Sequence, residues 1–276
     1  MVRRGSTTRS DEGRRAVLAL LPGELRRIMR PPFEVLVCLV GNGLLATGLW
    51  FFSPIEVYSL FFSFHLDFLF PAVLATWMLA DVPATNQLAP ESTRVIGLLD
   101  DPEKVTDLLR AKQVALMLLV VPVAIITAVL NGMVTHHWFT LATTTVWVTT
   151  VPLAGLGLSC LIGVRWPYHP ISLVDRWSKR RQWRTMLLRW GILVTAPYVV
   201  VPAVGWLALV VPGLLLWVTH GLGSRNFLDD VNLMISEVIA VPTAVWLWRW
   251  GTARAGHWAH ERQGALTAYL SDPELG

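Results

Sequence analysis

Charged residues are scarce in this chain, and the scarcity is uneven. Only 15% of its 276 residues are Asp, Glu, Lys or Arg, whereas a typical soluble domain has about 25%. Residues 113–164, a run of 52, contain none of the four. A helix of that length would extend about 78 Å, more than twice the thickness of a hydrocarbon core of about 30 Å. This run must therefore cross a membrane twice, and the composition argues against a soluble cytoplasmic enzyme.

The sequence also lacks the short motifs of several enzyme classes. It contains no G-x-x-x-x-G-K-[ST] phosphate loop, no H-E-x-x-H zinc motif and no G-x-S-x-G nucleophile motif. Its two cysteines, Cys38 and Cys160, both lie in apolar runs and have no metal-binding spacing. We therefore predict no catalytic residue, no metal site and no cofactor on this chain.

The apolar runs predict an all-α, polytopic membrane protein with six transmembrane helices. The expected spans are 33–53, 57–80, 112–132, 139–163, 190–218 and 232–249. Gly132 and the pair His136 and His137 divide the long uncharged run into the third and fourth helices. The chain then has three parts, which are a basic N-terminal segment (1–32), a transmembrane domain (33–249) and a C-terminal tail (250–276).

Lysine and arginine lie almost entirely on one side of these spans. With this topology, 22 of the 23 basic residues fall in the N-terminal segment, in the loops after the second and fourth spans, or in the tail. Only Arg225 falls on the other side. The positive-inside rule therefore predicts that both termini are cytoplasmic. The 20 arginines against 3 lysines are typical of a GC-rich bacterial genome, so we expect a bacterial cell membrane.

The N-terminal segment predicts a helix on the inner membrane surface. Residues 14–30 place an apolar face beside a charged one, and anionic lipids attract each basic side chain by about 1 kcal/mol. We expect Pro22 and Gly23 to interrupt this helix. The charged residues assigned to the interfacial helix are Glu24, Arg26, Arg27 and Arg30.

The inner loop 81–112 predicts a second helix start. Asp101 is a good N-cap, Pro102 suits the first helical position, and Glu103 favours the positive end of the helix dipole. Val105 and Leu108 begin an apolar stripe that leads into the third span. The acidity of this segment is unusual for an inner loop, and it points to a protein partner rather than to phospholipid.

The remaining inner segments are basic. Residues 165–189 interleave aromatic and basic side chains, a pattern that can bind nucleic acid. Beside a membrane, topology and lipid headgroups explain it more simply, so we expect membrane lipids and no nucleic acid as partners. In the tail, His257 and His260 fit no zinc motif, and we expect a solvated basic helix end.

Three ionisable residues lie inside the expected spans, namely His65, Asp67 and Glu237. A charge at the bilayer centre costs about 2.5–3.5 kcal/mol on insertion scales, so such groups usually face the bundle interior. His65 and Asp67 would point about 200° apart on a helix and so do not pair. The three are candidates for a translocation path. The alternatives are structural hydrogen bonding by Asp67 and an interfacial position for Glu237.

Four features together resemble the membrane subunits of type-2 ATP-binding cassette (ABC) exporters. Residues 21–32 resemble the interfacial connecting helix of that family, and the expected topology has six spans with both termini inside. Residues 95–99 and 108–112 resemble the stretch that docks on the ATPase and ends in a lysine. The run LGLSC at 156–160, followed by Trp-Pro at 166–167, is similar to the exit of the fourth span in bacterial members.

The resemblance implies a permease subunit without catalytic activity that forms half of a translocation path. It would pair with itself or with a similar permease, and a separate ABC ATPase subunit would carry ATP and Mg. The residues implied in ATPase coupling are Asp101, Glu103, Asp107, Leu108 and Arg110. One departure is the outer connection 219–231, which is shorter than the usual outer segment of the family.

Two other classes stay open. One is an integral membrane enzyme or assembly factor of lipid or cell-envelope metabolism, with Asp67, His65 or the pair His136 and His137 as working residues. The other is an ion-coupled transporter that uses Asp67 and Glu237 and is active without ATP. A neighbouring gene for a soluble P-loop ATPase would favour the exporter.

Overall fold

The computed structural model describes residues 6–52, 66–79, 82–136, 138–169 and 230–272, together with isolated positions between 188 and 218. Every regular element in this part of the chain is a helix, which agrees with the expected all-α class. Of the expected spans, most of the fifth and the first half of the second lie outside the described residues.

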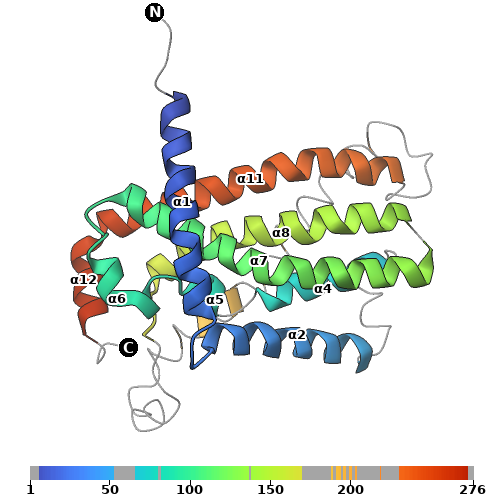
Figure 1. Cartoon of the computed structure of the whole chain (residues 1–276), viewed down its shortest axis with the longest axis horizontal. Coiled ribbons are helices and arrows are strands. Elements are labelled where there is room, and N and C mark those ends of the chain that lie inside the picture. Colours follow the sequence, from blue (N-terminus) through green and yellow to red (C-terminus); the bar gives the residue numbers. More distant parts are fainter. Residues whose placement is uncertain are drawn as a thin grey trace, which may run out of the picture.

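Among the described residues, the long helices lie side by side as a bundle (Figure 1). They are α2 (Glu34–Phe52), α4 (Leu66–Met78), α7 (Pro102–Thr135), α8 (Trp138–Arg165) and α11 (Asp230–Glu261). Within the described residues, Glu34–Phe52, Pro102–Val134 and Leu141–Arg165 are long and apolar enough to cross a membrane. The protein is therefore a helical membrane protein, while the number of six spans stays a prediction.

The predicted break in the long uncharged run is confirmed. Helix α7 ends at Thr135, and α8 begins at Trp138. His136 adopts a left-handed backbone conformation with φ of 59°, and its N–H donates to the carbonyl of Gly132 at 2.9 Å. A left-handed residue just past the last turn is a common way to end a helix, because it satisfies a carbonyl that the helix leaves free.

The expected interruption of the N-terminal helix is wrong. Helix α1 (Ser6–Ile28) continues through Pro22, and it lies across α7 near one end of the bundle (Figure 1). Proline removes one N–H donor from a helix. Here Pro22 and Gly23 lie on the exposed face, where solvent can satisfy the carbonyl that loses its donor. Glu24 and Ile28, on the opposite face, are buried.

Short helices fill the end of the bundle where α1 lies. The chain between α4 and α7 forms α5 (Val82–Thr85), the 3-10 helix η1 (Ala89–Glu91) and α6 (Ser92–Ile96). The C-terminal helix α12 (Gln263–Ser271) packs against α6 (Figure 1). Both α1 and α12 therefore lie at the same end of the bundle, which we call the α1 end.

The expectation of a solvated basic helix end holds for His257 and Glu261, which are exposed, but apolar residues that follow them are buried. Leu266 and Leu270 of α12 are buried with Val95, Leu99 and Val105 in one apolar cluster. Polar contacts fix the same segment. The ring nitrogen Nδ1 of His260 lies 2.9 Å from the carbonyl oxygen of Leu99. The tail therefore forms part of the folded core, because its apolar residues at helical spacing cover the segment before α7.

Because Leu266 is buried, shortening its side chain should weaken the packing of α12. Its side chain is 2% exposed, and removing a buried leucine typically costs about 2–5 kcal/mol. We expect Leu266→Ala to loosen α12 and to speed tryptic cleavage at Arg262. Exposed Gln263 provides the control, because Gln263→Ala should leave the cleavage rate unchanged. Equal cleavage of both variants would show that α12 is not docked.

Glycines allow close backbone contacts in the bundle. An added Cβ at Gly157 of α8 would lie 2.5 Å from the Cα of Trp248, and one at Gly251 of α11 would lie 2.6 Å from the carbonyl carbon of Gly157. At Gly163, the added Cβ would lie 2.7 Å from the carbonyl carbon of Thr85. At these positions, α8 approaches α11 and α5 so closely that no residue with a Cβ would fit without a shift of the backbone.

Candidate functional site

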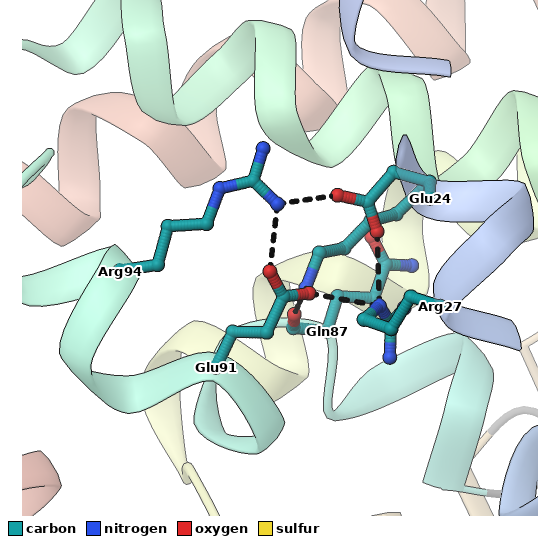
Figure 2. Close-up of polar contacts among 6 residues, drawn as sticks. Glu24, Arg27, Gln87, Glu91 and Arg94 are labelled. Carbon is teal, nitrogen blue, oxygen red and sulfur yellow. Dashed lines mark hydrogen bonds and ion pairs between the residues drawn. The ribbon is translucent and has the colours of Figure 1, made fainter. Parts of the chain in front are cut away.

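Charged side chains from three elements meet where α1 crosses the segment before α7 (Figure 2). Nη1 of Arg94 lies 2.7 Å from Oε1 of Glu24 and 2.7 Å from Oε2 of Glu91. Nε of Arg27 lies 3.1 Å from Oε2 of Glu24 and 2.9 Å from Oε1 of Glu91. The two carboxylates therefore lie between the two guanidinium groups, and α1 is tied to both η1 and α6.

Lys112 of α7 completes this arrangement, which we call the ion-pair cluster (Glu24, Arg27, Glu91, Arg94 and Lys112). Its ammonium group pairs with Oε1 of Glu91 and donates to the carbonyl of Gln87 at 2.7 Å. The Lys112 side chain is 3% exposed and Glu24 is fully buried. Such groups are stable in a protein interior only when they are paired and hydrogen-bonded.

Amide side chains continue the network into the bundle. Nε2 of Gln113 lies 3.3 Å from Oε1 of Gln87 and 3.3 Å from the carbonyl oxygen of Leu156. The indole N–H of Trp248 donates to Oε1 of Gln113 at 2.7 Å. Residues of α7, α8 and α11 are thus connected to the segment before α7. A displacement of that segment would therefore disturb hydrogen bonds to three of the bundle helices, α7, α8 and α11.

A second pair of hydrogen bonds fixes the start of this segment. Nδ2 of Asn86 donates to the carbonyl of Tyr168 at 2.6 Å, and the N–H of Tyr168 donates back to Oδ1 of Asn86 at 3.3 Å. Both residues are buried. The segment 85–94 is therefore held to the chain that follows α8 as well as to α1 and α7.

The electrostatics of the cluster favour the charged forms of Glu91 and Arg94. Burial alone would raise the pKa of Glu91, but Lys112, Arg94 and Arg27 outweigh this effect and hold the pKa below its ordinary value of 4.5. For Arg94, burial would lower the pKa, whereas Glu91 and Glu24 raise it above the ordinary value. Each partner thus stabilises the ionised form of the other.

This shift predicts a loss of stability in acid. Because the pKa of Glu91 is lower in the folded chain, its stabilising contribution is present above about pH 4.5 and is lost as the pH falls through the folded value. We expect the thermal unfolding midpoint in detergent to fall as the pH is lowered below about 4.5. Glu91→Gln should show a smaller fall, and an identical pH dependence would contradict the assignment.

One face of the segment before α7 remains open at the α1 end of the bundle. Asp101 caps α7, because its Oδ1 accepts hydrogen bonds from the N–H groups of Glu103 at 3.0 Å and Lys104 at 3.3 Å. The helix start predicted at Asp101 is therefore confirmed. The exposed residues of this segment and of the first turn of α7, which together we call the docking face, are Pro90, Thr93, Arg94, Gly97, Asp100, Glu103 and Lys104.

The predicted coupling residues lie in different environments. Glu103 is exposed, and Asp101 is half-buried at the helix cap. Asp107 and Arg110 are half-buried one turn apart, with Nη1 of Arg110 3.7 Å from Oδ1 of Asp107. Leu108 is 1% exposed and belongs to the apolar cluster, so it cannot touch a partner in this conformation. The coupling role of the other four stays a prediction.

The predicted interfacial residues divide into two groups. Arg26 and Arg30 are exposed, as expected for groups that meet headgroups or solvent. Glu24 and Arg27 instead belong to the ion-pair cluster. Sequence reasoning missed Glu91 as their partner. The only available signal was a lone acidic residue beside Pro90 and three residues before Arg94, an i,i+3 spacing that suits an ion pair.

The predicted path residues are only partly described. His65 lies outside the described residues, and for Asp67 the structure gives its place on α4 but not its side chain. Glu237 lies on α11 next to the buried ring of Trp147 on α8. Exposed His136 ends α7, and His137 lies outside the described residues. Of the three path candidates, only Glu237 has a described side chain, so their role in a translocation path stays a prediction.

Taken together, the fold and the site define a helical membrane protein with a polar network at one end of its bundle. No protein-family model matches the chain. Comparisons with curated proteins and with solved structures also give no match. Within the described residues, no group of three or more His, Cys, Asp or Glu side chains could hold a metal ion.

Proposed function

We propose that the chain is the membrane-spanning subunit of an ATP-driven exporter and that a separate ATPase subunit binds its docking face. The observation that carries the proposal is the ion-pair cluster. It joins a segment with an exposed face to α1 and, through Lys112 and Gln113, to the bundle. A partner that moves this segment would thus act on several helices at once.

The composition of the docking face suits a protein partner. Asp100, Glu103 and Lys104 are exposed on it, and a rim of both charge signs steers and orients a partner more than it adds affinity. Gly97 is exposed as well, so a partner can approach the backbone closely there. The buried side, with Val95 and Leu99, anchors the face to the folded core.

The proposed mechanism uses the ATPase as the only source of energy. ATP binding and hydrolysis on the partner would move the docking face, and the ion-pair cluster would transmit this movement to α1 and α7. Two copies of the chain, or one copy and a similar permease, would form the path between them. ATP and Mg would bind to the partner subunit and not to this chain.

Co-purification tests the proposal. A tagged chain extracted from native membranes should retain a P-loop ATPase subunit, identified by mass spectrometry. Asp100→Arg combined with Glu103→Arg should reduce the retained ATPase by more than about tenfold, because like charges at an interface cost several kcal/mol and about 1.4 kcal/mol is a factor of ten in affinity. The matched control is Asp11→Arg with Glu12→Arg on the exposed part of α1.

The two possible failures have different meanings. Retention of the ATPase by the Asp100 and Glu103 variant at the level of the control would place the docking face elsewhere. If the unaltered chain retains no ATPase and transports in its absence, the exporter proposal itself is wrong.

A further inference from the structure

Arg110 of α7 has fewer partners than a half-buried arginine needs. Its side chain is 26% exposed, and its nearest acidic partner is Asp107, with 3.7 Å between Nη1 and Oδ1. That distance is long for a hydrogen-bonded ion pair. The buried Nε–H group of Arg110 has no hydrogen-bond acceptor among the described residues. A buried donor without an acceptor is unfavourable, so this guanidinium is under-satisfied.

A second arginine lies on the neighbouring stretch of α11. The indole N–H of Trp248 donates to Oε1 of Gln113 at 2.7 Å, and an added Cβ at Gly256 would lie 2.6 Å from the carbonyl oxygen of Pro102. These two contacts place the part of α11 that carries exposed Arg249 against the part of α7 that carries Arg110, and the positive charge of Arg249 acts on Arg110. Asp107 is the acidic side chain paired with Arg110, so the three groups together carry a net positive charge. Two cations next to one carboxylate are an arrangement that an additional anion would stabilise.

Both arginines lie at the ends of uncharged stretches, where the expected spans would meet the lipid headgroups. Arg110 lies three residues before the uncharged run that starts at Gln113, and Arg249 directly follows the uncharged stretch 238–248. Beside Arg249, the exposed rings of Trp246 and Trp250 stack with their centroids 6.0 Å apart. Exposed tryptophans of this kind favour the interface between hydrocarbon and headgroups.

We propose that Arg110 and Arg249 form a binding site for a phosphate group, and that the headgroup phosphate of an anionic phospholipid is its occupant. Guanidinium groups bind phosphate oxygens through parallel N–H donors, which suits two arginines on adjacent helices. The acyl chains would extend along the apolar surface of α11 near Trp246, which is 60% exposed. This site is independent of the exporter proposal, because it needs no ATPase.

Native mass spectrometry of the detergent-purified protein tests the site with phosphatidylglycerol, phosphatidylcholine and inorganic phosphate as probes. We expect a phosphatidylglycerol adduct that exceeds the phosphatidylcholine adduct. Arg249→Gln should weaken the phosphatidylglycerol adduct about fivefold, since each basic residue at a membrane surface contributes about 1 kcal/mol to anionic lipid binding. Arg110→Gln should weaken the phosphatidylglycerol adduct similarly. Because Arg249 is exposed, the Arg249→Gln variant is the one expected to fold normally.

The control variant is Arg254→Gln. Arg254 is an exposed arginine on the same helix that lies over the ring of Trp258, 5.2 Å from its centroid. Its substitution should leave the adduct unchanged. If inorganic phosphate forms an adduct that depends on Arg249 and phosphatidylglycerol does not, the phosphate site would be supported but its occupant would be a soluble phosphate rather than a lipid. Equal adducts of both lipids, or a loss upon Arg254→Gln as large as that upon Arg249→Gln, would overturn the proposal.

Discussion

Gly251→Ala should strongly destabilise the protein, although alanine is a better helix former than glycine. The added Cβ would lie 2.6 Å from the carbonyl carbon of Gly157, so α8 and α11 would have to move apart. Backbone atoms cannot rotate away as a side chain can. We expect a loss of about 3 kcal/mol or more, which is in the range of severe overpacking. The measurement is the thermal unfolding midpoint in detergent.

The matched control is Gly48→Ala on α2. No atom lies within 4 Å of the position that its Cβ would occupy. Alanine favours a helix over glycine by about 1 kcal/mol, so this variant should be neutral or slightly more stable. If Gly251→Ala were as stable as Gly48→Ala, the close contact between α8 and α11 would be incorrect.

Glu91→Gln should cause the second large effect. The substitution leaves the ammonium group of Lys112, which is 3% exposed, with the carbonyl of Gln87 but without its carboxylate. Removing one partner of a buried ion pair typically costs about 3–5 kcal/mol, since the remaining charge is uncompensated. We expect a lower unfolding midpoint and faster proteolysis of the segment before α7.

A double variant separates loss of the pair from general disruption. Glu91→Gln with Lys112→Met removes both charges, and replacing a buried ion pair by apolar groups is often nearly neutral. It should therefore recover part of the stability that Glu91→Gln loses. Glu103→Gln, on the exposed docking face, should have little effect. A double variant less stable than Glu91→Gln would contradict the pairing of Glu91 with Lys112.

Local features of the fold were predictable from the sequence. Long uncharged runs predicted apolar helices, because hydrocarbon excludes unpaired backbone groups and so favours helices. The start of α7 at Asp101 was predictable from a cap residue followed by proline. The break before α8 was predictable because Gly132 and the polar pair that starts at His136 interrupt the uncharged run.

Long-range contacts were not predictable in the same way. Glu24 and Arg94 are 70 residues apart, and nothing in either segment indicates that they meet. The docking of α12 was missed because its basic neighbours suggested a solvated helix, whereas burial of Leu266 and Leu270 outweighs this preference. For a residue such as Leu108, an apolar side chain at helical spacing fits both a buried core and a protein interface, and only the packing decides between them.

Site-specific photo-cross-linking tests the central claim most directly. A photoreactive amino acid would replace Thr93 or Gly97 on the docking face, or Leu44 on α2 as a control that is 69% exposed. The proposal predicts covalent adducts with a P-loop ATPase subunit from Thr93 and Gly97, and none from Leu44. The absence of an ATPase adduct from both docking-face positions, or an equal adduct from Leu44, would contradict it.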